Sequence, residues 1–125
     1  EKRIDKLGET KTIAGKVYYL RSNDSWAMVD KDLDESASAI VGVAMGTNST
    51  THGMLLRGLV QVSQSGQSVL GQKVYMHDNG IVTGSIVNFA SDDYIRVLGY
   101  CVDSGNTNGS ASIYFNPDNT WIKKA

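Results

Sequence analysis

The first indication of the fold comes from residues 74–82, VYMHDNGIV, in which two short apolar runs flank the dipeptide Asn79-Gly80. A two-residue hairpin turn of type I′ needs positive φ at both central positions, and Asn followed by Gly meets this need well. The β-branched and aromatic residues beside the turn favour extended backbone. The stretch therefore predicts a β-hairpin.

Short apolar runs of the same kind continue along the chain. Thirteen glycines, one proline and many Ser, Asn and Thr residues separate them, as turns separate strands. We therefore predict an all-β fold, a small barrel or sandwich of about eight to ten short strands. The expected strands are 13–20, 26–29, 40–45, 54–62, 72–77, 81–82, 95–102, 111–116 and 121–123.

The second half of the chain repeats the first. Lys16-Val17-Tyr18 matches Lys73-Val74-Tyr75, an offset of 73 − 16 = 57 residues, and Gly42 matches Gly99 at the same offset. We infer two copies of one strand-turn-strand motif, which are expected to close each other's open sheet edges. Glycine at the same place in both copies predicts a bulge or a close backbone approach there.

These pseudo-repeats, about 16–58 and 73–115, are assigned to a single β domain, 12–125. A chain of 125 residues is below the length at which chains normally divide into domains. Residues 1–11 are interpreted as an N-terminal extension or the end of a stalk. A short helical turn is possible there, because two apolar residues three apart precede Gly8.

The composition argues against several classes of partner. A net charge of −1 provides no basic field to attract nucleic acid. Apolar runs are too short for membrane insertion. The single cysteine, Cys101, has no partner for an internal disulfide, and with two histidines it cannot complete a structural zinc site. No cofactor is predicted.

The acidic run at 30–35 resembles the start of a calcium loop, in which alternating carboxylates surround one cation. Such a loop needs Gly at its sixth position and a bidentate Glu at its twelfth, where this chain has Glu35 and Val41. We therefore interpret the run as a solvated loop and predict no metal ligands.

Candidate catalytic groups are poorly arranged in the sequence. His77 and Asp78 are adjacent, and neighbours on a strand point to opposite faces, so they do not form a dyad. Cys101 is expected to be a small buried core residue, because Ala44 occupies its place in the first copy. Serines lie outside the Gly-x-Ser-x-Gly pattern of a nucleophile elbow. No catalytic residues are predicted, and the chain is expected not to be an enzyme.

Ligand contact is predicted for Trp26 and Trp121, because each large ring is flanked by polar turn-forming residues and can stack on a ligand. The carboxylates of Asp92, Asp93 and Asp118 could also hold a sugar or an ion. Adjacent acids before a strand are more often simply a loop, so only the two tryptophans are retained as predicted ligand-binding residues.

Three stretches resemble a module found at the ends of tailed-phage virion proteins. They are IRVLGYCVD at 95–103, IYFNPDNTWI at 113–122 and GMLLRG at 53–58. With the VYYL and VYM strands, the resemblance covers about residues 12–125. Such proteins are tail-fibre, appendage or capsid-associated structural proteins. The repeated strand pattern is also similar to small head-fibre or capsid-decoration proteins.

The resemblance implies a non-enzymatic structural protein of a tailed-phage virion, the terminal domain of a fibre or appendage involved in host-surface attachment. It implies other virion proteins as partners, a homotrimer, and a host-surface glycan or protein as ligand. The protein is then expected on the particle surface after assembly in the host cytoplasm. Two alternatives stay open, a capsid decoration protein that stabilises the shell and a carbohydrate-binding lectin domain.

Overall fold

The structure is a computed structural model that describes residues 11–65, 68–103 and 109–124. Within these ranges it contains eleven strands and one short helix, so the predicted all-β class is confirmed. The possible helical turn within residues 1–8 lies outside the described residues.

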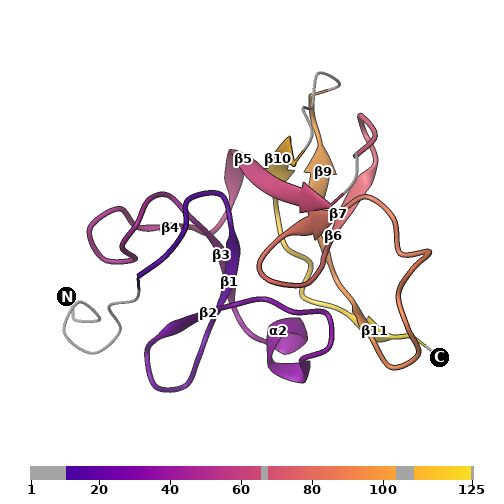
Figure 1. The fold of residues 1–125 in the computed structure, drawn as a ribbon, viewed down its shortest axis with the longest axis horizontal. Coiled ribbons are helices and arrows are strands. Elements are labelled where there is room, and N and C mark those ends of the chain that lie inside the picture. Colours follow the sequence, from indigo (N-terminus) through magenta and orange to yellow (C-terminus); the bar gives the residue numbers. More distant parts are fainter. Residues whose placement is uncertain (1–10, 66–67, 104–108, 125) are drawn as a thin grey trace.

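The first copy of the motif forms an antiparallel sheet of strand order β2-β1-β3-β4. This first sheet lies on the left in Figure 1. Its edge strands are β2 and β4. The strands are β1 (Val17–Leu20), β2 (Trp26–Met28), β3 (Val41–Ala44) and β4 (Met54–Leu55).

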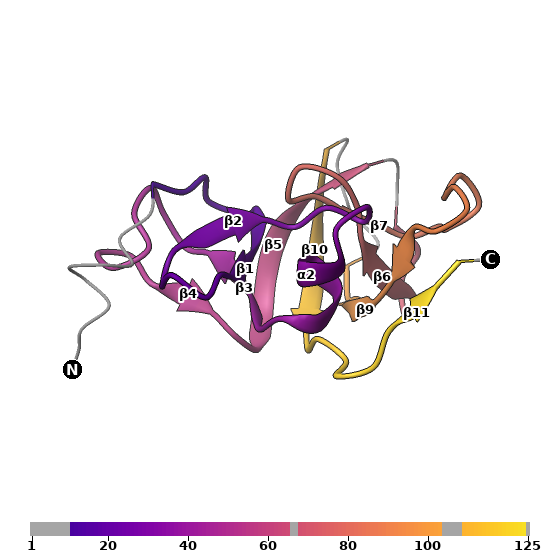
Figure 2. The same ribbon diagram turned by 90° about the horizontal axis from the view of Figure 1, so that it is seen from below.

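The second copy lies in a closed barrel of order β10-β5-β7-β6-β9. Figure 2 shows β5 between the first sheet and the more distant barrel strands. All pairings in the barrel are antiparallel except that of β5 with β7. The strands are β5 (Gly58–Ser65), β6 (Lys73–Met76), β7 (Val82–Thr83), β9 (Val97–Cys101) and β10 (Ser110–Phe115).

Two of the predicted strands are divided. The expected strand 54–62 bends at Leu56-Arg57, where the chain leaves the first sheet as β4 and enters the barrel as β5. The expected strand 95–102 is interrupted at Arg96, which separates β8 (Tyr94–Ile95) from β9. Strand β8 pairs instead with β11 (Ile122–Lys123) in a small separate sheet.

The two copies share their strand order. Shifted by the repeat offset, β1, β2, β3 and β4 correspond to β6, β7, β9 and β10. Neighbours in the first sheet run β2-β1-β3-β4, and their counterparts in the barrel run β7-β6-β9-β10. The expectation that the copies close each other's edges is wrong, however. Strand β5, which follows the first copy in the chain, closes the sheet of the second copy into a barrel. The sheet of the first copy stays open.

The hairpin predicted at Asn79-Gly80 is confirmed. Both residues have positive φ, 56° and 75°, and the turn joins β6 to β7. The same turn also reaches the first sheet, because the Val17 amide donates to the Gly80 carbonyl at 2.7 Å and the Gly80 amide donates to the Val29 carbonyl at 3.0 Å. A turn of the second copy is therefore hydrogen-bonded between β1 and the residue after β2.

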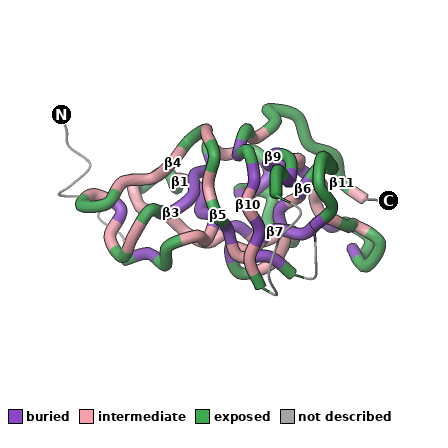
Figure 3. Tube along the Cα trace, turned by 90° about the horizontal axis from the view of Figure 1, so that it is seen from above, coloured by how far each residue is buried: buried purple, intermediate pink, exposed green. Residues whose placement is uncertain are grey.

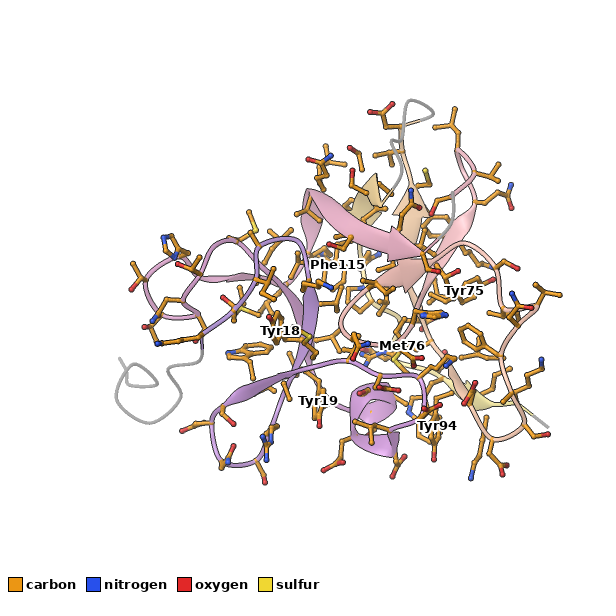
Figure 4. All side chains as sticks on the ribbon, viewed as in Figure 1. Tyr18, Tyr19, Tyr75, Met76, Tyr94 and Phe115 are labelled. Atoms are coloured by element: carbon orange, nitrogen blue, oxygen red, sulfur yellow. The ribbon has the colours of Figure 1, made fainter. Side chains whose placement is uncertain are left out.

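Both copies contribute to one apolar core. Figure 3 shows buried positions along strands of the first sheet and of the barrel, and in Figure 4 Met76 lies between Phe115 and the helix. Cys101 and Ala44 are both 1% exposed, as expected. The cluster includes Val17, Val41 and Val43 of the first sheet, Ala37 of the helix, and Val62, Val74, Met76, Leu98, Ile113 and Phe115 of the barrel.

The two matched glycines have different surroundings. A Cβ atom at Gly99 would overlap the carbonyl oxygen of Tyr114 on β10, and the pairing of β6 with β9 shifts register beside Gly99. A Cβ at Gly42 would lie 3.2 Å from the Leu55 carbonyl oxygen, a tight contact that a small shift can relieve. Close approach is therefore confirmed for both, and it is severe only at Gly99.

The acidic run was expected to be a loop, and this is wrong for its second part. Residues Asp34–Ser38 form helix α2. Ser36 and Ala37 are fully buried, and the Ser36 hydroxyl accepts a hydrogen bond from the Asp30 amide at 3.0 Å. A helix of little more than one turn has too few residues to show a period in the sequence. The described residues include no helix long and apolar enough to cross a membrane.

Candidate functional site

A cluster of charges surrounds Lys31, where the first copy meets the β6–β7 hairpin. The ammonium nitrogen of Lys31 lies 3.0 Å from both carboxylate oxygens of Asp78. It also lies 3.7 Å from Asp93 and 3.8 Å from Asp32. The Tyr94 amide donates to the Lys31 carbonyl at 2.7 Å. This ion-pair network ties the loop before α2 to two segments of the second copy.

The carboxyl groups of the network differ in proton affinity. A hydrogen bond with Asp93, together with burial, raises the pKa of Asp32 to about 6. Burial, the largest single influence, acts to raise the pKa of Asp78, but its hydrogen bonds with Lys31 and Asp30 and the Lys31 charge together lower that pKa. Burial likewise acts to raise the pKa of Asp93, but its hydrogen bonds with Asp32 and the Ala90 amide and the Lys31 charge together lower that pKa. The pKa of Asp32 therefore lies above the ordinary aspartate value and that of Asp93 below it.

Part of this network has the spacing of a cation site. Carboxylate oxygens of Asp30, Asp32 and Asp78 lie within 4.8 Å of one another, and hard cations prefer such ligands. The Lys31 ammonium, however, already contacts both oxygens of Asp78. It supplies the positive charge that a metal ion would bring, so we interpret the cluster as a stabilising network within the chain.

A groove of about 390 Å³ opens at another part of the junction. Four segments form it: the start of β3, the bend between β4 and β5, the residue between β8 and β9, and the chain after β10. Two arginines and several apolar residues line this groove. Its lining residues are Ile40, Val41, Leu56, Arg57, Arg96, Asn116, Pro117 and Asn119.

Arg96 forms the buried part of the groove and is 5% exposed. Its Nε donates to the Asp118 carbonyl at 2.9 Å, and its Nη1 donates to the carbonyls of Ala39 at 2.7 Å and Ser36 at 3.2 Å. Burial lowers the pKa of Arg96, and the Asp118 charge partly opposes this. One side chain thereby connects the end of α2, the start of β9 and the chain after β10.

A third feature is an exposed row of large side chains on the barrel. Leu59, Tyr114 and Tyr100 are neighbours in register on β5, β10 and β9, with 73%, 37% and 42% of their surface exposed. We call these three residues the outer barrel row. Beside it lies a hollow of about 220 Å³, lined by Gly71, Gln72, Lys73, Tyr75, Gly84 and Tyr100.

The predicted ligand-binding tryptophans lie on different sheets. Trp26 is partly buried on the edge strand β2. Trp121 precedes β11, is 37% exposed, and packs edge-on against Tyr94 with ring centroids 5.3 Å apart. Figure 1 shows β2 and β11 well separated, so the two rings do not form one site. Ligand contact at either ring stays a prediction.

The sequence interpretation missed Arg96, Arg57 and Lys31. A signal existed for Arg96, since it is the single charged residue within the apolar run from Ile95 to Val102. A charge in such a run is either exposed or held by specific partners. Lys31 has no comparable signal, because its partner Asp78 is 47 residues away in the chain.

Comparison with known protein families, with curated proteins and with solved structures finds no match for this chain. Its function must therefore be inferred from the three features of its surface: the ion-pair network, the groove and the outer barrel row.

Proposed function

We propose that this chain is a non-enzymatic structural protein of a tailed-phage virion, the terminal domain of a fibre or appendage that attaches the particle to the host surface. The observation that carries the proposal is the outer barrel row of Leu59, Tyr114 and Tyr100. Large apolar and tyrosine side chains exposed side by side are typical of contact surfaces. Because the barrel is closed, its outer wall offers side chains and not a free backbone edge.

The hollow beside the row supports a role in attachment. Tyr75 and Tyr100 provide ring faces and hydroxyl groups, and Gln72 and Lys73 provide polar groups. A shallow site of this kind suits a glycan or a loop of a surface protein. In a homotrimer three such sites would act together, so modest contacts would add up through avidity.

The state of the reactive side chains also supports a non-enzymatic role. Lys31 is held by Asp78. Cys101 is buried, and its thiol donates to the Asp103 carbonyl at 3.5 Å. His77 packs edge-on against Phe89, with ring centroids 5.8 Å apart. Lys31 and Cys101 are thus held by contacts within the chain, the His77 Nδ1 is buried without a hydrogen-bond partner among the described residues, and none of the three residues lines the hollow beside the outer barrel row.

Electron microscopy of phage particles carrying this chain, labelled with a gold-tagged antibody against it, tests the proposal. We expect gold at the ends of fibres or appendages. Gold spread over the capsid would favour the decoration protein instead, and particles without label would overturn a virion role. Sugar release from a glycan array would contradict the non-enzymatic part of the proposal.

A variant tests the use of the outer barrel row. Replacing Tyr100 and Tyr114 with Ser should reduce particle adsorption to host cells by about tenfold or more, because central aromatic contacts dominate such surfaces. The control is Val87→Ser, which changes a residue that is 76% exposed outside the row. Equal adsorption of both variants would show that the row is not the attachment surface.

A further inference from the structure

The groove at Arg96 contains positive charge that Asp118 offsets only in part, through its charge and without an ion-pair contact. Among the described residues, no carboxylate lies within ion-pairing distance of Arg96 or Arg57. Asp118, the acid whose charge acts on Arg96, uses Oδ1 to accept hydrogen bonds from the amide and hydroxyl of Thr120 at 3.2 and 3.0 Å. A buried guanidinium that donates to carbonyl groups and contacts no carboxylate favours binding of an anion.

The hydrogen bonds of Arg96 leave part of its guanidinium available. Its Nε and Nη1 are occupied by three carbonyl groups, whereas Nη2 donates to no acceptor among the described residues. Arg57 is exposed at the bend between β4 and β5 and faces the same groove. Two guanidinium groups in one groove suit a carboxylate, which can accept paired hydrogen bonds from arginine.

The other residues that line the groove indicate what kind of molecule would carry this carboxylate. Ile40 and Leu56 are 59% and 54% exposed and line the groove together with Pro117. Asn116 and Asn119 add side-chain amides that can pair with a peptide backbone. No aromatic ring is present among the lining residues, all of which are described. A sugar would lack its usual stacking partner, whereas aliphatic side chains would find contacts.

We propose that this groove binds an acidic peptide segment of a protein partner, with a carboxylate on Arg57 and Arg96 and aliphatic neighbours on Ile40 and Leu56. The groove shares no lining residue with the outer barrel row or its hollow. The inference is independent of the virion role, and either can fail without the other.

An NMR titration of the ¹⁵N-labelled chain tests the inference. The probe is acetyl-Leu-Glu-Leu-amide, and its matched control is acetyl-Leu-Gln-Leu-amide, which keeps the shape and loses the charge. We expect the acidic peptide to shift the backbone amides of Leu56, Arg57 and Asn119, and the neutral peptide to bind about tenfold more weakly, because charge-assisted bonds are lost. Equal binding of the two peptides, or no shift at these amides, would overturn the inference.

Two variants and a second ligand sharpen the test. Arg57→Gln should weaken binding of the acidic peptide about tenfold, and Arg21→Gln, the same charge change at an exposed site outside the groove, should not. Equal weakening by both variants would show only a general charge effect and would contradict the proposed site. If glucuronate shifted the same amides at lower concentration than the peptide, the groove would be a site for acidic sugars and the proposal would be wrong.

Discussion

The first sheet and the barrel have the same strand order, but only the barrel is closed. In the first sheet β2 and β4 remain edge strands, whereas β5 joins the corresponding strands β7 and β10 of the second copy. Closure holds β9 and β10 so near each other that Gly99 has no room for a side chain, while Gly42 at the matching place has some. The additional strand β5 therefore makes the second copy less tolerant of a side chain at its matched glycine than the first copy.

The largest expected effect distinguishes the two matched glycines. We predict that Gly99→Ala lowers the free energy of unfolding by about 4 kcal/mol, because the new Cβ overlaps the backbone of β10 and the closed barrel resists movement. Gly42→Ala should cost only about 1 kcal/mol, since the contact with Leu55 can relax. Urea unfolding of both variants measures the difference. Equal losses of unfolding free energy would show that barrel closure does not determine how well a matched glycine accepts a side chain.

Arg96 provides a second contrast, because its counterpart in the first copy, 96 − 57 = 39, is Ala39. Arg96→Met keeps the aliphatic stem but leaves three carbonyl groups without their donor. It should cost about 3 kcal/mol, since unsatisfied buried groups are costly. The control Arg57→Met removes an exposed guanidinium and should change stability by less than about 0.5 kcal/mol. A small loss for both variants would show that Arg96 does not connect the two copies.

The pH dependence gives a smaller effect at the junction. Because the pKa of Asp32 is raised to about 6, its contribution to stability is complete below its ordinary pKa and is lost as pH rises through about 6. We expect the unfolding free energy to fall between about pH 4 and pH 7, most of it below pH 6. The change should stay below about 1 kcal/mol, because Asp32 is largely exposed and screened.

Asp32→Asn should remove this decline, because an amide can keep a hydrogen bond to Asp93 without titrating. Asp34→Asn, which changes an exposed acid on α2, should leave the decline in place. Melting temperatures of the three proteins at several pH values provide the measurement. A decline that persists in Asp32→Asn would assign it to other groups.

Local features of the fold could be predicted from the sequence. The Asn79-Gly80 turn has its own conformational preference, and apolar runs bounded by glycine mark strands wherever they end up. The divisions at Leu56-Arg57 and at Arg96 were missed, because each reflects which sheet the following residues join. Helix α2 was missed because burial of Ala37 against distant strands stabilises it, and this leaves no local pattern.

The surface features were even less predictable. The outer barrel row depends on the pairing of β5, β10 and β9, which brings Leu59 beside Tyr114 from far along the chain. In the sequence, Leu59 and Tyr100 lie within the expected strands 54–62 and 95–102, and nothing indicates that they share a face with Tyr114. The charges around Lys31 and the groove at Arg96 likewise combine segments of both copies. Such sites form where segments far apart in the chain pair with each other. The short-range hydrophobic pattern of the sequence does not show which segments will pair.

The central claim is that one shared core makes the first sheet and the barrel a single cooperative unit. Hydrogen exchange at two matched amides tests it directly: Ala44, which donates to the Lys16 carbonyl at 3.0 Å, and Cys101, which donates to the Gln72 carbonyl at 2.9 Å. We predict that both exchange through global unfolding, with free energies equal within about 1 kcal/mol. If Ala44 exchanged at a free energy lower by about 2 kcal/mol or more, the first sheet would open on its own and the claim would be contradicted.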